Sequence, residues 1–298
     1  MRILVTGANG QVGWELSSRS RQEGLDITAL KRAALDITDQ TAVRKEIKRH
    51  SLSLVVNAAA YTGVDRAESE PELAFAVNRD GPAYLASACA EAKIPLVHIS
   101  TDYVFDGQKK SPYLETDPIS PLSIYGKSKA AGEVEIRNRL QEHIIVRTSW
   151  IYGVHGHNFV KTMLRLGREN ESVWVVVDQF GCPTYAADLA ETILIIIAKL
   201  REPGEIEWGT YHYCGKGVAS WHGFTEAIFE LARRHTSLRV KNVEPIKTDE
   251  YPTPAKRPAN SVLDCSLLEK KFDIHPKPWS ESLARMIETL FSIEKSKP

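Results

Sequence analysis

Three glycines near the start of the chain constrain its fold more than any other feature. Gly7, Gly10 and Gly13 are spaced Gly-x-x-Gly-x-x-Gly, directly after the apolar run 3–6 and at the start of a helical pattern over 11–23. Gly7 permits a tight turn, Gly10 lets the backbone approach a pyrophosphate, and Gly13 allows close packing of helix on strand. The free N–H groups of a helix N-terminus suit phosphates. The pattern predicts a dinucleotide-binding unit, the alternative being a plain tight turn.

The order of segments extends this unit through the first half of the chain. Strand-like runs and helical patterns alternate, in the order strand 3–6, helix 11–23, strand 25–30, helix 38–50, strand 52–57, helix 71–92, strand 95–100, helix 121–139 and strand 144–148. This alternation predicts an α/β fold, a Rossmann-type doubly wound parallel sheet with helices on both faces. Such sheets bind ligands at the carboxyl ends of their strands.

The second half of the chain is less regular. Helical patterns at 159–168, 186–200, 221–234 and 279–291 are separated by loops rich in proline and glycine. We therefore expect residues 1–150 to form an NAD(P)-binding Rossmann domain, to which later segments return. Residues 151–298 are expected to form mainly a smaller, mixed α/β substrate-binding lobe.

Composition argues against several classes of partner. Lysine plus arginine and aspartate plus glutamate each number 38, so the net charge is zero and no nucleic-acid surface is expected. The longest apolar run, 192–198, is too short to span a bilayer, and the N-terminus lacks a signal-peptide stretch. The four cysteines form no C-x-x-C pair, which suits a reducing compartment. A cytoplasmic protein without membrane partners is expected.

The cofactor contacts expected beyond the glycines lie on the next two strand ends. An NAD-specific site usually places an acidic side chain after the second strand, whereas this chain has Lys31 and Arg32 there. Two cations suit the 2′-phosphate of NADPH, although a solvated basic turn gives the same pattern. NADPH is favoured and NADH remains open. The predicted cofactor set is Gly7, Gly10, Gln11, Val12, Gly13, Lys31, Arg32, Asp36, Ile37, Ala58, Ala59, Ala60, Tyr61, Thr62, Tyr125 and Lys129.

A second motif supplies candidate acid–base chemistry. Tyr125 and Lys129 are spaced Tyr-x-x-x-Lys in a helical pattern, so both side chains lie on one face of the helix. A free tyrosine titrates near pH ~10, and a nearby ammonium lowers the pKa of the phenol toward neutrality. Tyr125 can then act as a general acid for a developing alkoxide. The spacing is common by chance, but together with the glycine loop it indicates carbonyl/alcohol redox chemistry.

These motifs together resemble the extended short-chain dehydrogenase/reductase superfamily. Over essentially the whole chain, longer blocks resemble the dTDP-4-dehydrorhamnose reductase family: NAAAYT at 57–62, VD at 64–65, AE at 67–68, STDYVFDG at 100–107, RTSW at 147–150, DQFGCPT at 178–184 and RPANS at 257–261. The resemblance implies NAD(P)H-dependent reduction of the 4-keto group of dTDP-4-dehydro-β-L-rhamnose (dTDP-6-deoxy-L-lyxo-4-hexulose) to dTDP-L-rhamnose. The partner it implies is a dTDP-sugar substrate.

The resemblance also implies a role for each matching residue. Tyr125 gives the proton, Lys129 holds the nicotinamide ribose and lowers the pKa of Tyr125, and the hydroxyl of Thr101 bonds the substrate or Tyr125. The implied substrate contacts are Thr101, Asp102, Tyr103, Trp150, Asn158 and Arg257. Structural alternatives stay open, since Tyr103 and Trp150 can be core residues, Asp102 can cap a turn, and Arg257 can tie two loops together.

The oligomeric state expected from the resemblance is a monomer or a weak homodimer. Some members of the family are dimers that magnesium bridges through glutamates. Glu15 fits one such position, but Ala187 stands where a second glutamate is expected and Glu288 is offset from the third. No metal site is expected at His155 and His157 either, because a third ligand is missing.

Two other readings of the same motifs remain open. One keeps the fold and changes the sugar, giving a reductase or an epimerase of another nucleotide sugar. The other is a non-catalytic regulatory subunit of a methionine adenosyltransferase, which is a relative of the family. A silent binding subunit has no need of Tyr125, Lys129 and Thr101 together, and all three are present.

Overall fold

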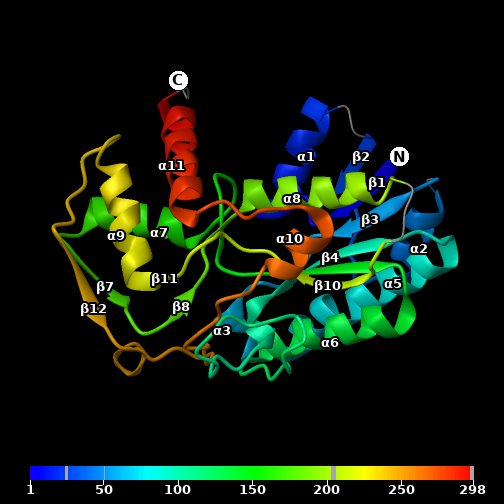
Figure 1. Cartoon of the computed structure of the whole chain (residues 1–298), viewed down its shortest axis with the longest axis horizontal. Helices are drawn as coiled ribbons and strands as arrows, with labels where there is room; N and C mark the ends of the chain where they lie inside the picture. Colours follow the sequence, from blue (N-terminus) through cyan, green and yellow to red (C-terminus); the bar gives the residue numbers. More distant parts are fainter. Residues whose placement is uncertain (24–25, 50, 203–205, 296–298) are drawn as a thin grey trace.

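A parallel sheet, with helices packed on it, forms the right-hand part of the molecule in Figure 1. The computed structural model describes residues 1–23, 26–49, 51–202 and 206–295. Within these residues, six strands pair in the order β10-β5-β4-β3-β1-β2, and every pairing between neighbours is parallel. The strands are β1 (Arg2–Thr6), β2 (Asp26–Leu30), β3 (Leu54–Asn57), β4 (Leu96–Thr101), β5 (His143–Thr148) and β10 (Gly209–His212). The predicted fold class is confirmed.

Helices cover both faces of this sheet, as its sequence pattern predicts. Helices α1 (Gln11–Glu23) and α8 (Ala186–Lys199) lie on one face, and α2 (Gln40–Arg49), α5 (Gly81–Ala92) and α6 (Ile124–Arg139) lie on the other (Figure 1). Because side chains alternate along a strand, Ile3 and Val5 of β1 belong to the first core and Leu4 belongs to the second.

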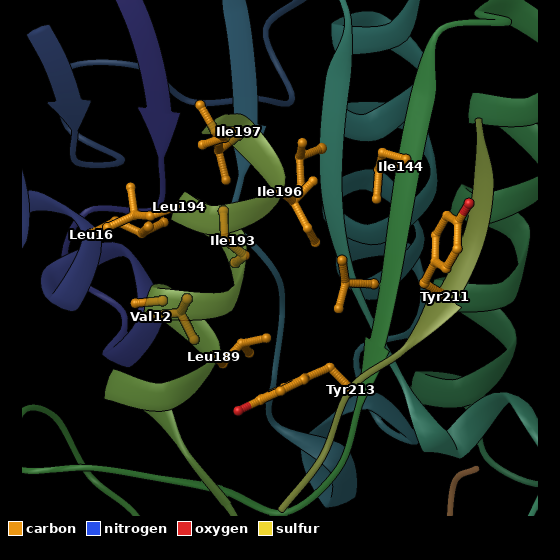
Figure 2. Close-up of a cluster of buried hydrophobic side chains, with 14 of the residues drawn as sticks. Val12, Leu16, Ile144, Leu189, Ile193, Leu194, Ile196, Ile197, Tyr211 and Tyr213 are labelled. Carbon is orange, nitrogen blue, oxygen red and sulfur yellow. The ribbon is translucent and has the colours of Figure 1, made fainter. Parts of the chain in front are cut away.

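The first of these cores explains the apolar run at 192–198. Figure 2 shows Val12 and Leu16 of α1 facing Leu189 and Ile193 of α8, in the cluster that covers the sheet. The run therefore belongs to a helix that the sheet buries. None of the helices among the described residues has the length and apolarity needed to cross a membrane.

Most of the predicted elements of the first half are present, with shifts at their ends. Residue 25 of a predicted strand and residue 50 of a predicted helix lie outside the described residues. The predicted helix 71–92 is divided into α4 (Pro71–Phe75), a π-helical turn η1 (Ala76–Asp80) and α5. The bulge brings the backbone of Asn78 against α6, where a Cβ on Gly132 would lie 2.0 Å from the Asn78 carbonyl oxygen.

The second half contains elements that the sequence pattern did not indicate. Strand β10 returns to the central sheet beside β5, and α10 (Ser266–Phe272) packs on the first core. The short strands β6 (Ile151–Tyr152), β7 (Ser172–Val176), β8 (Phe180–Gly181), β9 (Thr184–Tyr185), β11 (Ala219–Ser220) and β12 (Asn242–Ile246) form three two-stranded pairs.

A separate core holds the rest of the second half together. Helices α7 (Phe159–Glu169), α9 (Trp221–Ala232) and α11 (Trp279–Lys295) surround a cluster that includes Phe224 and Phe229. The predicted helices over these segments are present. The proposed division of the chain at residue 150 remains a prediction.

Candidate active site

A cavity of about 690 Å³ opens at the carboxyl ends of the central strands. The strand order reverses around β1, so this edge of the sheet is its topological switch point. On the sheet side the cavity is lined by Gly10, Ala58, Thr101, Tyr125 and Lys129. On the side of the separate core, which the second half of the chain forms, it is lined by Phe159 and Trp221. The glycine loop and the Tyr-x-x-x-Lys helix, more than a hundred residues apart in the sequence, therefore share one cavity.

The three glycines of the loop have different structural demands. Gly7 has φ +72°, and a Cβ there would lie 2.6 Å from the backbone of Ala58. A Cβ on Gly13 would lie 2.3 Å from the carbonyl oxygen of Gly7. Around Gly10 a Cβ would meet only the Gly7 oxygen, at 3.3 Å, and Gly10 lines the cavity. Gly7 and Gly13 serve close packing, whereas Gly10 leaves the backbone open to a ligand.

The candidate acid–base residues come from α6 and from the end of β4. Helix α6 begins after Ser123, whose side chain accepts a hydrogen bond from the N–H of Gly126, and this cap places Tyr125 in the first turn. Thr101 ends β4, and its hydroxyl lies close enough to the phenol of Tyr125 to affect the pKa of that group. Thr101, Tyr125 and Lys129 all line the cavity, as predicted, although their chemical roles remain predictions.

The ionisation of this pair differs from the expected one. Burial raises the pKa of Tyr125 to about 12, and the nearby hydroxyl of Thr101 acts in the opposite direction. The Lys129 Nζ donates to the carbonyl oxygen of Ile99 at 2.7 Å and lies 3.2 Å from His98 Nε2. The shared helix face is present, but the lysine side chain is directed to β4 instead of the phenol. The expectation of a phenol pKa near neutrality is therefore wrong for this structure.

Asp102 carries a buried carboxyl group with one free oxygen. Its Oδ1 accepts from the hydroxyl of Thr101 at 3.0 Å, while its Oδ2 has no hydrogen-bond partner among the described residues. Burial raises the pKa of Asp102 to about 7, and the nearby hydroxyls of Ser261 and Thr101 act in the opposite direction. The cap of the following turn η2 (Asp102–Val104) is Thr101, whose Oγ1 accepts from the N–H of Tyr103. Asp102 lines the cavity, and its role as a substrate contact remains a prediction.

Aromatic rings form the opposite wall of the cavity. Trp150 stacks on Trp221 with ring centroids 3.5 Å apart and an interplanar angle of 6°. A Cβ on Gly181 would lie 2.5 Å from the Trp150 ring, so the indole is held between two surfaces. Phe159 packs on the same pair at a tilt, with its ring at 48° to that of Trp221 and the centroids 4.5 Å apart. Trp150 has φ +46°, a conformation that costs energy for a non-glycine residue and is common at functional sites.

The sequence reasoning missed Trp221 and Phe159. Both are the first residue of a helix, directly after the capping residues Ser220 and Asn158. A large aromatic at that position is the only signal in the sequence, and it does not indicate which cavity the ring faces.

Several other predicted contacts also line the cavity. Tyr103 is among them, and its ring lies edge-on to that of Tyr125 with centroids 5.6 Å apart. Gln11, Val12, Ala58, Ala60 and Thr62 line it too. Tyr61 is turned away and its hydroxyl bonds Glu70 at 2.6 Å.

Other predicted residues are engaged elsewhere in the structure. Arg32 pairs with Asp36 at 3.0 Å, and Ile37 is a residue of the second core of the sheet. Asn158 accepts from the N–H of Lys161 as the cap of α7 and donates to the Gln11 amide oxygen at 3.0 Å. None of Lys31, Arg32, Asp36, Ile37, Ala59 and Asn158 lines the cavity, and their roles as contacts stay predictions.

Arg257 forms a contact between two loops. Its guanidinium binds both carboxylate oxygens of Asp65, at 2.7 and 3.1 Å. Asp65 lies in the short helix α3 (Val64–Ala67), beside the loop after β3. The contact matches the alternative in which Arg257 ties loops together, and Arg257 does not line the cavity.

A glycine loop at the switch point of a parallel sheet, with a Tyr-x-x-x-Lys helix on the same cavity, defines an oxidoreductase of the short-chain dehydrogenase/reductase type. The comparisons with known proteins make this class specific. The chain belongs to the dTDP-4-dehydrorhamnose reductase family, and the family model described as "RmlD substrate binding domain" matches residues 1–292. The family inferred from the sequence motifs is therefore confirmed.

Individual relatives show how far the likeness extends. A protein of Sinorhizobium fredii named dTDP-4-dehydrorhamnose reductase is 43% identical over 97% of this chain and 98% of its own length. A solved structure of a dTDP-4-dehydrorhamnose reductase from Clostridium acetobutylicum superposes with a TM-score of 0.91, at 41% identity over 97% of this chain and 99% of that one. The Bacillus anthracis enzyme, solved in complex with NADP, has a TM-score of 0.90 at 39% identity and the same coverage.

Proposed function

We propose that this protein reduces the 4-keto group of dTDP-4-dehydro-β-L-rhamnose to dTDP-L-rhamnose, with NADPH as the reductant. The observation that carries the proposal is the convergence of Thr101, Tyr125 and Lys129 on the cavity that the glycine loop opens into. Relatives of 38 to 44% identity over nearly the whole chain are named for this reaction. The relative solved with NADP supports the choice of cofactor.

The residues present fit a dinucleotide cofactor. Gly10 gives the backbone an open face on the cavity, and the N-terminus of α1 presents its free N–H groups there. The small residues Ala58 and Ala60 line the neighbouring edge. Lys31 and Arg32 are the proposed contacts for a 2′-phosphate. When bound, the reduced nicotinamide supplies the hydride.

Tyr125 is the proposed proton donor. Because burial raises its pKa to about 12, the phenol stays protonated at neutral pH and can pass its proton to the carbonyl oxygen as negative charge develops. The hydroxyl of Thr101 lies beside that phenol and is proposed to orient it and to stabilise the charge, although its proton is donated to Asp102 Oδ1 before the substrate binds. Asp102 is proposed to bind a sugar hydroxyl, and the rings of Trp150 and Trp221 exclude water from the opposite side.

We also propose that the protein acts in the cytoplasm as a monomer or weak homodimer, without a bridging magnesium. The free cysteines Cys89, Cys182, Cys214 and Cys265 fit a reducing compartment. Ala187 stands beside Asp188 on α8 where the resemblance calls for a glutamate.

The direct test follows the loss of reduced nicotinamide absorbance after adding dTDP-6-deoxy-L-lyxo-4-hexulose to the purified protein. NADPH and NADH are compared, and the product is identified by NMR. Rapid oxidation of NADPH with formation of dTDP-L-rhamnose is expected. NADPH binding without oxidation would contradict the proposal. Inversion of a sugar centre by protein that retains its nicotinamide would instead identify an epimerase.

A further inference from the structure

A chain of buried polar side chains crosses the sheet beneath the active-site cavity. Thr6 of β1, Asn57 of β3 and His98 of β4 are each fully buried, and Lys129 of α6 is 2% exposed. Thr6 Oγ1 lies 2.6 Å from Asn57 Oδ1, and Asn57 Nδ2 lies 2.9 Å from His98 Nδ1. His98 Nε2 lies 3.2 Å from Lys129 Nζ. The proposed mechanism gives no task to His98.

The direction of each hydrogen bond in this chain follows from one backbone group. The N–H of Ala59 points at Asn57 Oδ1 from 3.1 Å, and a backbone N–H can only donate. The oxygen of the Asn57 amide must therefore face Ala59 and Thr6, and its NH₂ group faces His98 Nδ1. That ring nitrogen accepts, so the proton of the neutral imidazole is on Nε2.

The fixed tautomer of His98 then constrains Lys129. An Nε2–H group faces Lys129 Nζ, which also donates to the carbonyl oxygen of Ile99 at 2.7 Å. A neutral amine has one lone pair and can accept from His98 while it donates to Ile99. An ammonium group has three donors and no acceptor, so it would set donor against donor.

We propose that His98 is a positioning residue for Lys129: its Nε2–H donates to the lysine amine, anchors the amine on β4 and favours its neutral form. This inference rests on the proposed reductase function for its kinetic consequences, but the hydrogen-bond network stands without it. Through Asn57 and the N–H of Ala59, the network joins the lysine to the loop after β3, which lines the cavity.

The groups around Lys129 allow its amine to lose its charge just above neutral pH. Burial lowers the pKa of Lys129 to about 8, and Glu133, one helical turn further, acts in the opposite direction. The carboxylate of Glu133 is itself neutralised by Arg147 at 2.7 Å and by Arg137 at 3.2 Å. Tyr125, on the preceding turn of α6, and Asp102 and Thr101, at the end of β4, share its cavity. Burial keeps His98 neutral by lowering its pKa well below the ordinary value, and a positive charge on Lys129 or His143 lowers that pKa further.

The consequence is a lysine that can change its charge near neutral pH. An ordinary lysine, with a pKa of ~10.4, stays an ammonium throughout turnover. A buried lysine with a hydrogen-bond donor on its amine can take up and release a proton within the site.

Nitrogen NMR of the histidine rings tests the tautomer without any activity. Protein labelled with ¹⁵N-histidine is titrated from about pH 6 to about pH 9, the range in which an ordinary histidine loses its charge, and the His98 signals are assigned by their loss in His98→Gln. A neutral ring protonated at Nε2 across the range is expected. A ring protonated at Nδ1, or a ring that gains charge, would overturn the inference.

The effect on Lys129 is tested by the pH profile of kcat/KM for NADPH, which reports groups of the free enzyme. In His98→Phe the donor is lost, and the limb of the profile that reports Lys129 should move to higher pH by about one unit, because an ordinary hydrogen bond changes an equilibrium about tenfold. His98→Gln retains an N–H donor and should stay closer to wild type.

His222→Gln is the matched control, because its ring, on α9, bonds the Val243 carbonyl oxygen at 3.0 Å and does not line the cavity. The inference is wrong if His98→Phe lowers the rate at every pH without moving a limb. Should wild type show no NADPH oxidation, the proposed function fails, and the NMR titration still decides the tautomer. The same holds if His98→Phe does not fold.

Discussion

The two walls of the cavity are built on opposite principles. The wall on the sheet side carries the buried polar side chains of Thr101, Asp102, Tyr125 and Lys129. Hydrogen bonds hold the hydroxyl of Thr101 on Asp102 and the amine of Lys129 on Ile99. The opposite wall is a stack of rings with Trp150 and Trp221 at its centre. Directional bonds place an atom within tenths of an ångström, which proton transfer requires. Stacked rings offer area without a fixed direction, which suits binding.

The comparison also shows where the cost of the site lies. Burial raises the pKa of Tyr125 to about 12 and of Asp102 to about 7, and it lowers that of Lys129 to about 8. Each shift means that the native state holds an ionisable group in an environment that opposes its charge. The aromatic wall carries one strained backbone, at Trp150, but no such electrostatic cost.

The largest effect is expected from removing one oxygen of the polar wall. Tyr125→Phe should lower kcat by about 10²- to 10⁴-fold, the usual contribution of a positioned general acid, with KM for the sugar nucleotide changed only a few-fold. Steady-state kinetics with NADPH measures both. Tyr84→Phe, in a partly buried tyrosine of α5 packed in the second core of the sheet, is the control. A near-wild-type kcat in Tyr125→Phe would remove the distinction between the walls.

The electrostatic cost of the polar wall can be measured at Asp102. Between about pH 4 and pH 7 the unfolded carboxyl is ionised while the native one, with its pKa of about 7, stays protonated. The native state binds more protons there, so stability falls as pH rises through this window and the penalty is complete above it. Asp102→Asn removes the penalty.

Urea unfolding should therefore show Asp102→Asn to be more stable than wild type near pH 8, by at most about 4 kcal/mol, with the gain vanishing near pH 4. Asp106→Asn is the control of opposite sign, because hydrogen bonds from the Gln108 N–H and Tyr113 lower the pKa of Asp106. An equal gain for Asp102→Asn at both pH values would show that its charge is not the cause.

The polar wall was largely predictable from sequence because its residues are local. Tyr125 and Lys129 share one helix face, and Thr101 and Asp102 follow one strand, so short patterns place them at the same edge of the sheet. What the pattern did not give is where the lysine amine points. That direction depends on His98 and Ile99 across the helix–sheet interface, and a spacing rule contains no such partner.

The aromatic wall was not predictable, because its rings belong to residues 150, 159 and 221 and meet only through the separate core of the second half. The same applies to β10, a four-residue strand that joins the sheet beside β5 after an excursion of some sixty residues. Short strands whose pairing partner is distant carry little periodicity of their own. The long helices, by contrast, were predicted because apolar residues recur along them with the helical period.

The aromatic wall should affect binding and leave the chemistry intact. Trp221→Ala removes one ring of the stack, and a ring pair contributes about 0.5–1.5 kcal/mol beyond its buried area. We expect KM for the sugar nucleotide to rise about tenfold with kcat within a few-fold of wild type. Trp174→Ala, at a tryptophan that is 64% exposed, is the control. A fall in kcat as large as the rise in KM would show that the stack also positions the reacting groups.

The smallest effect is expected from the ion pair that joins the loop of Arg257 to the short helix of Asp65. Arg257 binds Asp65 with both guanidinium nitrogens, and the two side chains are 22% and 40% exposed. Partly exposed pairs contribute about 0.2–1 kcal/mol, so Arg257→Ala should raise KM only a few-fold, and less at high salt. Arg257→Lys keeps the charge but loses the bidentate geometry, and should behave like Arg257→Ala.

A double-mutant cycle with Asp65→Asn separates the two roles considered for Arg257. If the arginine acts only by closing the loops, removing Asp65 already abolishes its contribution, and Arg257→Ala then adds nothing further to KM. If it contacts the diphosphate of the substrate, its loss raises KM just as much without Asp65, because the ligand charge is still unmatched. Arg257 lies outside the cavity lining, and its guanidinium donates to Asp65, Thr253 and Ala255. We therefore expect that Arg257→Ala adds nothing to KM once Asp65 has been replaced.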